Sequence, residues 1–113
     1  MLTSEIVARL GFRILAEGRD CPVTGGYVAD LLSDVIANAQ EGCIWVTVQR
    51  HLNIIAVAQL KKVAGVLVPA GCIPEANVLE RAVKEGIFIL QGTGDAFEIC
   101  GRLYGLLQQS NQT

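Results

Sequence analysis

The chain has 113 residues, of which 51% are hydrophobic and 18% charged, and its formal net charge is −2. This length suits one domain, so we predict a single domain over residues 1–113. Its nine basic residues are scattered and only 5% of residues are aromatic. Nucleic acids require a clustered basic surface with stacking aromatics, so we exclude a nucleic-acid partner.

The apolar segments are too short to cross a membrane. The longest, residues 63–70, falls well below the roughly 20 residues that a spanning helix needs. No basic segment followed by an apolar run marks a signal peptide, so we predict a cytoplasmic protein without membrane contact. A mean hydropathy of +0.43 fits either buried parallel strands or an apolar surface hidden by self-association. We expect a homodimer, the commonest symmetric assembly.

The first forty residues contain two predicted helices and two predicted strands. In chain order they are a helix at 2–10, strands at 12–16 and 23–28, and a helix at 30–39. Thr3 or Ser4 is predicted to cap the first helix and Gly11 to end it. Asp30 and Asp34 lie near the amino-terminal end of the second helix, where the macrodipole favours carboxylates.

From residue 43 a strand followed by a helix occurs three times. The predicted strands are apolar segments at 43–48, 65–68 and 87–90, and the predicted helices lie at 53–60, 74–84 and 95–107. Asn53 is the predicted N-cap of the first helix, and Pro74 suits the first turn of the second. Asp95 and Glu98 have capping-box spacing for the third. The polar tail, 108–113, is predicted to be frayed.

This alternation predicts an α/β fold. Short loops between strands and helices are typical of parallel strands joined by crossover helices, and wholly apolar strands are typical of a sheet buried on both faces. We therefore predict a three-layer α/β/α sandwich with a parallel or mixed central sheet.

The loops after the three predicted strands form a candidate ligand site. In open parallel sheets, ligands bind beyond the carboxyl ends of the strands, and each of these loops leads into a helix N-terminus that favours anions. The candidate ligand-binding residues are Gln49, Arg50, His51, Asn53, Gly71, Gly92 and Thr93. With a fixed cation at Arg50 and a titratable one at His51, the set suits a phosphate or carboxylate. Asn53 and Thr93 fit capping or turn roles equally well, and Arg50 also fits an ion pair with Asp95 or a place at a dimer interface.

Residues for independent catalysis are lacking. His51 is the single histidine, and nothing in the pattern supplies the base and orienting group of a triad. There is no P-loop, and Gly92-Thr93-Gly94 is not a dinucleotide fingerprint. The four cysteines lack the close spacing of zinc or iron–sulfur ligands and are interpreted as small buried hydrophobes. We predict no catalytic residues, no metal and no cofactor.

Two stretches, residues 24–35 and 45–58, resemble the DRTGG domain family, and the resemblance extends from Ile6 to Leu107. The chain looks like the small stand-alone members that are similar to the N-terminal domain of HPr kinase/phosphorylase. The Asp-Arg element of the family name falls near Arg50-His51 and the Thr-Gly-Gly element at Pro69-Ala70-Gly71, so the chain departs from the motif at both places.

The resemblance implies a three-layer α/β fold, dimer formation and no activity of its own. Family members accompany CBS domains in regulated pyrophosphatases or precede phosphate acetyltransferase domains. Stand-alone members are similar to accessory proteins of iron-hydrogenase systems. The leading hypothesis is a non-catalytic dimeric regulatory module, with or without a small anionic ligand such as a nucleotide. The alternatives are a structural adaptor for a protein partner, including an iron-hydrogenase accessory, and a metal or redox protein that uses the cysteines.

Overall fold

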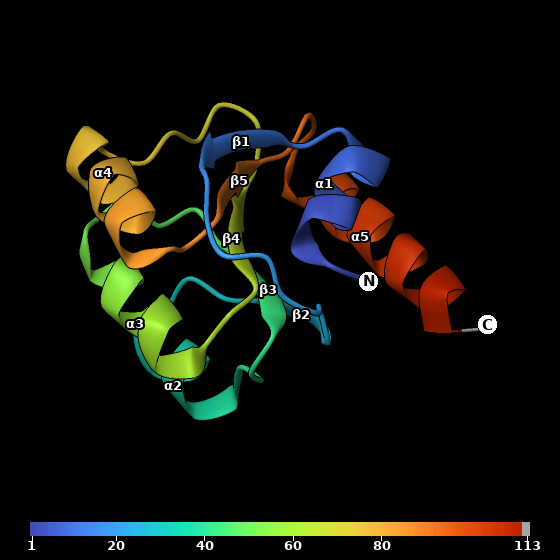
Figure 1. Cartoon of the computed structure of the whole chain (residues 1–113), viewed down its shortest axis with the longest axis horizontal. Helices are drawn as coiled ribbons and strands as arrows, with labels where there is room; N and C mark the ends of the chain where they lie inside the picture. Colours follow the sequence, from blue (N-terminus) through green and yellow to red (C-terminus); the bar gives the residue numbers. More distant parts are fainter. Residues whose placement is uncertain (112–113) are drawn as a thin grey trace.

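A five-stranded mixed sheet forms the centre of the molecule (Figure 1). The computed structural model describes residues 1–111. The strands are β1 (Arg13–Ala16), β2 (Gly25–Val28), β3 (Cys43–Val46), β4 (Gly65–Val68) and β5 (Ile89–Gln91). Their spatial order is β1-β5-β4-β3-β2. Strands β2 to β5 are parallel, and β1 runs antiparallel to β5.

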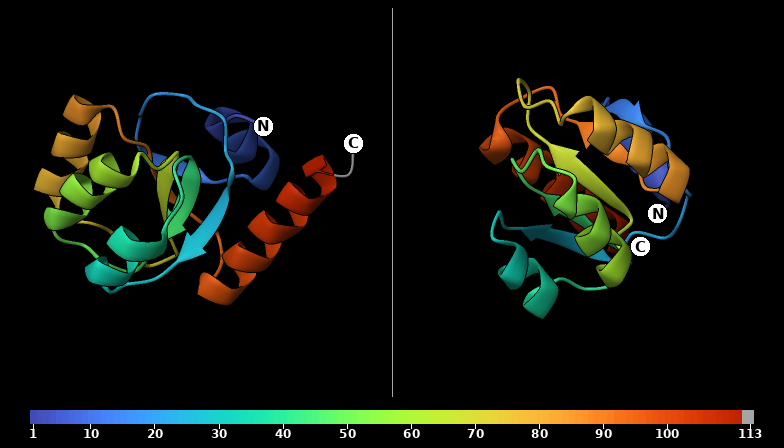
Figure 2. Two further views of the ribbon diagram at one scale, coloured as in Figure 1. Left: turned by 90° about the horizontal axis from the view of Figure 1, so that it is seen from below. Right: turned by 90° about the vertical axis from the view of Figure 1, so that its left-hand side faces the viewer.

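Helices cover both faces of this sheet, which confirms the predicted three-layer α/β fold (Figure 2). The helices are α1 (Thr3–Leu10), α2 (Leu32–Asn38), α3 (Asn53–Lys61), α4 (Ala76–Glu85) and α5 (Ala96–Asn111). Helices α2, α3 and α4 pack on one face, and α1 and α5 pack on the other.

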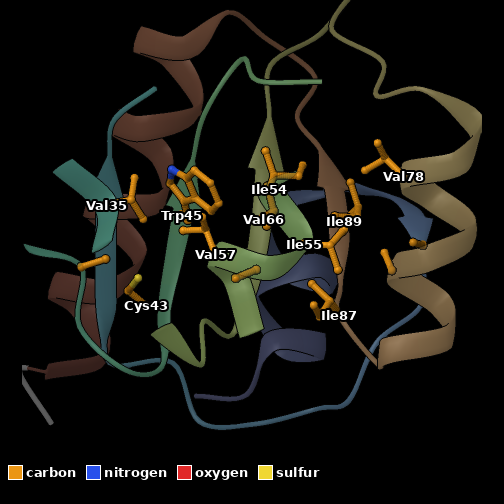
Figure 3. Close-up of a cluster of buried hydrophobic side chains, with 14 residues drawn as sticks. Val35, Cys43, Trp45, Ile54, Ile55, Val57, Val66, Val78, Ile87 and Ile89 are labelled. Carbon is orange, nitrogen blue, oxygen red and sulfur yellow. The ribbon is translucent and has the colours of Figure 1, made fainter. Parts of the chain in front are cut away.

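The central strands divide their side chains between two cores. Trp45, Val66 and Ile89 point towards α2, α3 and α4, as Figure 3 shows for that core. Their neighbours Ile44 and Leu67 point the other way, towards α1 and α5. All five are 0% exposed, and full burial of one large apolar side chain stabilises the fold by about 1.5–3 kcal/mol. Burial on both faces explains why these strands lack alternating polarity.

The predicted cap of α1 is wrong. Leu2 occupies the N-cap position, and no side chain caps the helix there. Thr3 is instead fully buried in the first turn, and its hydroxyl donates a hydrogen bond of 3.0 Å to the carbonyl of Ala64. The Ser4 hydroxyl donates to the carboxylate of Asp20. Both hydroxyls therefore bind distant segments rather than their own helix.

Two predictions about the other helices are also wrong, and one is confirmed. Leu52 is the N-cap of α3, so Asn53 is already inside the helix. Helix α4 begins at Ala76, after Pro74, because Glu75 is still extended with a ψ of 153°. Asp95 does cap α5, since its carboxylate accepts the N–H of Glu98 at 2.9 Å.

The polar tail that was predicted to be frayed begins within α5, and its fraying stays a prediction. Helix α5 continues through residues 108–111 to Asn111. No glycine or proline follows Gly105 in this stretch to end the helix, and Leu106 remains buried against the core. Residues 112–113 of the predicted tail lie outside the described residues.

Candidate functional site

The loops that follow β3, β4 and β5 meet at one rim of the sheet. This follows from the parallel direction of the three strands, and the loops are hydrogen-bonded to one another. The N–H of Glu75 donates to the carbonyl of Arg50 at 3.3 Å, and the N–H of Ala70 donates to the carbonyl of Gly94 at 3.0 Å. The shared rim predicted from the sequence is therefore present, and we call it the carboxyl rim.

A fourth loop, the one after β2, anchors this rim through Asp30. One carboxylate oxygen of Asp30 accepts the hydroxyl of Thr47 at 2.8 Å and the N–H of Val48 at 2.9 Å. The side-chain amide of Gln49 donates to the carbonyl of Asp30 at 2.8 Å. With the N–H of Val48 bound to a side chain, β3 ends at Val46, two residues before its predicted end.

Sequence reasoning missed this role of Asp30, which it assigned to the dipole of the following helix. The residue that Asp30 binds is 17 positions away, and no local motif connects them. Thr47 is a rare buried polar residue, with 2% of its surface exposed. Thr47 at the end of an otherwise apolar strand was the one sequence signal of this contact, because a buried hydroxyl needs a hydrogen-bond partner.

Arg50 is the free cation of the carboxyl rim. Its side chain is exposed, and within the described residues its guanidinium has no hydrogen bond or ion pair, with Asp95 or with any other carboxylate. His51 differs, because its Nδ1 lies 2.9 Å from Oε1 of Glu75, with 73% of the histidine side chain and 55% of the glutamate side chain exposed. Arg50 can therefore meet an anion without breaking an existing contact.

The helix N-termini that follow β3, β4 and β5 at this rim are not equivalent. Glu75 stands at the N-cap of α4, and the Asp95 carboxylate caps α5. Both places already hold a negative charge, which complements the helix dipole. Helix α3 has Leu52 at its N-cap and no side-chain cap. The start of α3 thus has no acidic residue of its own and has Arg50 beside it, although the Glu75 carboxylate reaches His51 there at 2.9 Å.

The other predicted site residues divide into an accessible group and a structural group. Asn53 is exposed in the first turn of α3, and Gly71 is exposed in the loop after β4 with a φ of +82°. The side chain of Gln49 is used in the Asp30 anchor. Asn53 and Gly71 are thus open to a ligand, while Gln49 holds the rim together.

Gly92 and Thr93 belong to the structural group. Gly92 is buried, and a Cβ there would lie 2.3 Å from Cγ2 of Ile99, so a larger residue does not fit. The hydroxyl of Thr93 accepts a hydrogen bond of 3.1 Å from Arg102, which also donates to the carbonyl of Leu10 at 2.8 Å. Thr93 therefore points towards the α1 and α5 layer, away from Arg50.

Two hollows lie away from Arg50 and His51. The larger, of about 730 Å³, is at the opposite rim, which we call the amino rim, and includes Arg19, Lys62 and Glu85. Lys62 pairs with Glu41 at 3.6 Å there. Helices α3 and α4 end at this rim, and carbonyl ends disfavour anions. The helix polarity and the unpaired Arg50 therefore make the carboxyl rim the better anion site, although this hollow is larger.

The cysteines and acidic residues form no evident reactive centre. Within residues 1–111, no three His, Cys, Asp or Glu side chains group closely enough to hold a metal ion. The four thiols are free. Burial raises the pKa of Cys43 and of Cys100, which lowers the fraction of reactive thiolate. No helix in the described part of the chain has the length and apolar character needed to cross a bilayer.

Comparison with known proteins identified one informative structure. No protein-family model matches the chain, and no curated protein matches it. The fold is similar to the crystal structure of the CBS and DRTGG domains of the regulatory region of Clostridium perfringens pyrophosphatase, complexed with the activator diadenosine tetraphosphate. The TM-score is 0.69 at 22% identity, over 90% of this chain and 45% of that one. The chain thus spans less than half of that regulatory region and has a DRTGG-like fold.

Proposed function

We propose that this protein is a non-catalytic, homodimeric regulatory module that binds a small anionic ligand of the nucleotide class at the carboxyl rim. The observation that carries the proposal is the uncapped N-terminus of α3 beside the unpaired guanidinium of Arg50. The pyrophosphatase region with a similar fold was crystallised with diadenosine tetraphosphate. This supports a phosphate-bearing nucleotide as the class of ligand to test first.

In the proposed mode, a phosphate group accepts a hydrogen bond from the N–H of Asn53, because the next two N–H groups of α3, those of Ile54 and Ile55, already bind the carbonyls of His51 and Leu52. Arg50 adds charge-assisted hydrogen bonds in the planar geometry that matches phosphate oxygens. Asn53 supplies neutral hydrogen bonds to the same ligand. The Asp30 anchor holds the start of this loop through hydrogen bonds of 2.8–2.9 Å. The loop is therefore already ordered, and ligand binding loses little conformational entropy there.

The same geometry supports a non-catalytic role. A histidine that acts as a base needs a nucleophile on one ring nitrogen and an orienting group on the other. His51 has Glu75 at Nδ1, but among the described residues no side chain is hydrogen-bonded to its Nε2. The pKa shifts of Cys43 and Cys100 disfavour thiolate chemistry at those thiols.

Thermal unfolding with ATP, AMP or inorganic phosphate, each at constant ionic strength, tests the proposal. A ligand that binds the folded state alone stabilises it by about 2.7 kcal/mol at one hundred times its dissociation constant. We expect Arg50→Ala to abolish this stabilisation. Arg9→Ala is the matched control, because Arg9 is an exposed arginine on α1, across the sheet from α3. Wild-type protein that none of the three ligands stabilises, or an Arg50→Ala variant that keeps the full effect, would contradict the proposal.

A second candidate is a structural adaptor for another protein, which includes an accessory role beside an iron-hydrogenase. Exposed apolar side chains favour it, notably Phe97 at 87% and Tyr104 at 68% exposure. If nucleotides and phosphate leave the unfolding temperature unchanged in the same experiment, the adaptor becomes the better account.

A further inference from the structure

A charge-free groove runs between β2 and α5 at the free edge of the sheet. The left view of Figure 2 shows these two elements side by side. The volume of the groove is about 380 Å³, and none of its lining residues carries a formal charge. We call this surface the α5 groove; its main lining residues are Val28, Phe97, Cys100, Gly101, Tyr104 and Leu107.

Large apolar side chains project from the groove into solvent. Phe97, Tyr104 and Val28 are 87%, 68% and 60% exposed. Burial of one aromatic side chain removes roughly 150–250 Å² of surface from water. Exposed apolar residues also occur on the other helix layer, but there they stand among charges. Leu60, for example, is 64% exposed and precedes Lys61 and Lys62. The lining of the α5 groove carries no charge, and the charged neighbours Glu98 and Arg102 on α5 are not part of it.

Next to these projecting side chains, α5 has a shallow hole. Gly101 and Gly105 lie one turn apart, and a Cβ built at either would meet no atom within 4 Å. Each interior glycine costs a helix about 1 kcal/mol relative to alanine, and the packing of the folded monomer does not require either one. What the two glycines permit is the close approach of another backbone or ring. Projection and hole are thus on one surface, so the surface is complementary to itself.

The strand beside the groove is also unprotected. Strand β2 pairs with β3 on one side and is an edge of the sheet, and its sequence Gly25–Val28 contains no charge and no proline. The opposite edge, β1, carries Arg13 and a register shift between Ile14 and Ala16, two features that protect edges from pairing. An unprotected edge pairs most simply with an identical strand in antiparallel direction.

We propose that the α5 groove is the two-fold interface of the homodimer, in which Phe97 of each copy inserts beside Gly101 and Gly105 of the other. A charged residue on a two-fold axis lies opposite the same residue of the other copy, and the two like charges repel. The lining of this groove contains no charged residue. The two β2 edges then lie antiparallel and extend the sheet across the axis. A stable interface needs about 800 Å² from each partner, for which α5, about 24 Å long at 1.5 Å per residue, and β2 offer a continuous surface. The inference specifies the dimer of the proposed function and does not depend on the ligand.

Analytical ultracentrifugation of three variants tests the interface. Wild-type protein should sediment at twice 12.1 kDa at micromolar concentration. Phe97→Glu places two like charges at the axis and should raise the dimer dissociation constant at least about thirty-fold. Leu60→Glu, a comparable change at an exposed leucine of the other layer, should leave the dimer intact. A wild-type monomer, an intact Phe97→Glu dimer, or equal disruption by both variants would overturn the inference.

Gly101→Leu is the third variant, and its side chain would occupy the space that the Phe97 of the other copy is proposed to enter. Open space surrounds this position, so the folded monomer should accept leucine and keep or raise its unfolding temperature, while the dimer weakens at least about tenfold. A Gly101→Leu protein that dimerises as well as wild type would contradict the interface. Arg50→Ala should still dimerise, and Phe97→Glu should still bind ATP if the proposed ligand site is correct, so the two proposals can fail separately.

Discussion

Three of the four charged side chains that line the amino-rim hollow are paired and one, Arg19, has no partner among the described residues. At the carboxyl rim, Arg50 likewise has no partner within residues 1–111. At the amino rim, Lys62 lies 3.6 Å from Glu41, and Glu85 binds both Gln59 at 2.9 Å and Arg81 at 3.2 Å. At the carboxyl rim, Asp30 holds a loop, Asp95 caps α5 and Glu75 lies 2.9 Å from His51, while Arg50 has no carboxylate partner in the described part of the chain.

Helix polarity accounts for much of the difference in how the two rims use their carboxylates. Parallel strands with helical crossovers place helix N-termini at one rim and helix C-termini at the other. Carboxylates therefore gather at the carboxyl rim for structural reasons, and the N-terminus of α3, which has no acidic residue of its own, is the place where an outside anion would bind. The larger hollow at the amino rim shows that volume alone does not identify such a site.

Removal of the Asp30 anchor should produce the largest effect on stability. Asp30→Ala leaves the buried hydroxyl of Thr47 and the N–H of Val48 without their partner, which should lower the free energy of unfolding by about 2–3 kcal/mol. Urea denaturation measures this change. Glu80→Ala, at an exposed position of α4, should stay within about 0.5 kcal/mol of wild type. A loss as small as that for Asp30→Ala would mean that the carboxyl rim is held by other contacts.

The anchor also shows where sequence reasoning reaches its limit. Apolar strands and helical periodicity are local properties, and they predicted the three layers and the shared rim correctly. The strand order was left open, because nothing in the sequence indicates that β1 reverses its direction beside β5. The partners of Thr3 and Asp30, at Ala64 and Thr47, are 61 and 17 residues away, beyond any local pattern.

The cap predictions failed for a related reason. Asn53 has the right chemistry for an N-cap, but Leu52 before it already has helical angles, with φ −60° and ψ −27°. The backbone path into a helix depends on where the preceding strand ends, and Asp30 decides that for β3. For the candidate site, the sequence proposed Arg50, His51 and Asn53 together with Gly92 and Thr93, and only the structure shows that the last two are held in structural contacts.

At the amino rim, Lys62→Gly should stabilise the protein. Lys62 ends α3 in the left-handed conformation with φ 52° and ψ 50°, which costs a residue with a side chain about 1 kcal/mol or more. Its exposed pair with Glu41 offsets little of this, so thermal unfolding should show a net gain of about 0.5–1 kcal/mol. ATP should stabilise this variant as it does wild type. Loss of the ATP effect here would place the ligand at the amino rim.

Asn53→Ala should change the free energy of unfolding by a smaller amount. The change should have the opposite sign to that expected for the loss of an N-cap. A true N-cap loses about 1 kcal/mol on replacement by alanine. Since Asn53 lies inside α3, alanine should instead raise the free energy of unfolding by about 0.5 kcal/mol or leave it unchanged. Chemical denaturation distinguishes the two cases, and a clear loss would restore Asn53 as the cap.

The smallest effect should be the pH dependence of stability that Asp20 contributes. Asp20 lies in the segment that leads to the amino-rim hollow. The hydroxyl and N–H of Ser4 hold the pKa of Asp20 below its ordinary value of 3.8. A lowered pKa adds stability that is present above 3.8 and is lost as the pH falls through the folded value. The stability difference between wild type and Asp20→Asn should therefore be greatest near neutral pH and should disappear in strong acid. Ser4→Ala should reduce the same dependence, and a difference that is independent of pH would contradict it.

The central claim is that the carboxyl rim, and not the amino rim, receives an anion. A titration of the ¹⁵N-labelled protein with ATP, followed by amide NMR shifts, tests it most directly. We predict saturable shifts in residues 49–54, with smaller shifts in the neighbouring loops at 70–75 and 92–95. Shifts centred on Arg19, Lys62 and Gly86, which line the amino-rim hollow, would contradict the claim, as would a spectrum that ATP leaves unchanged.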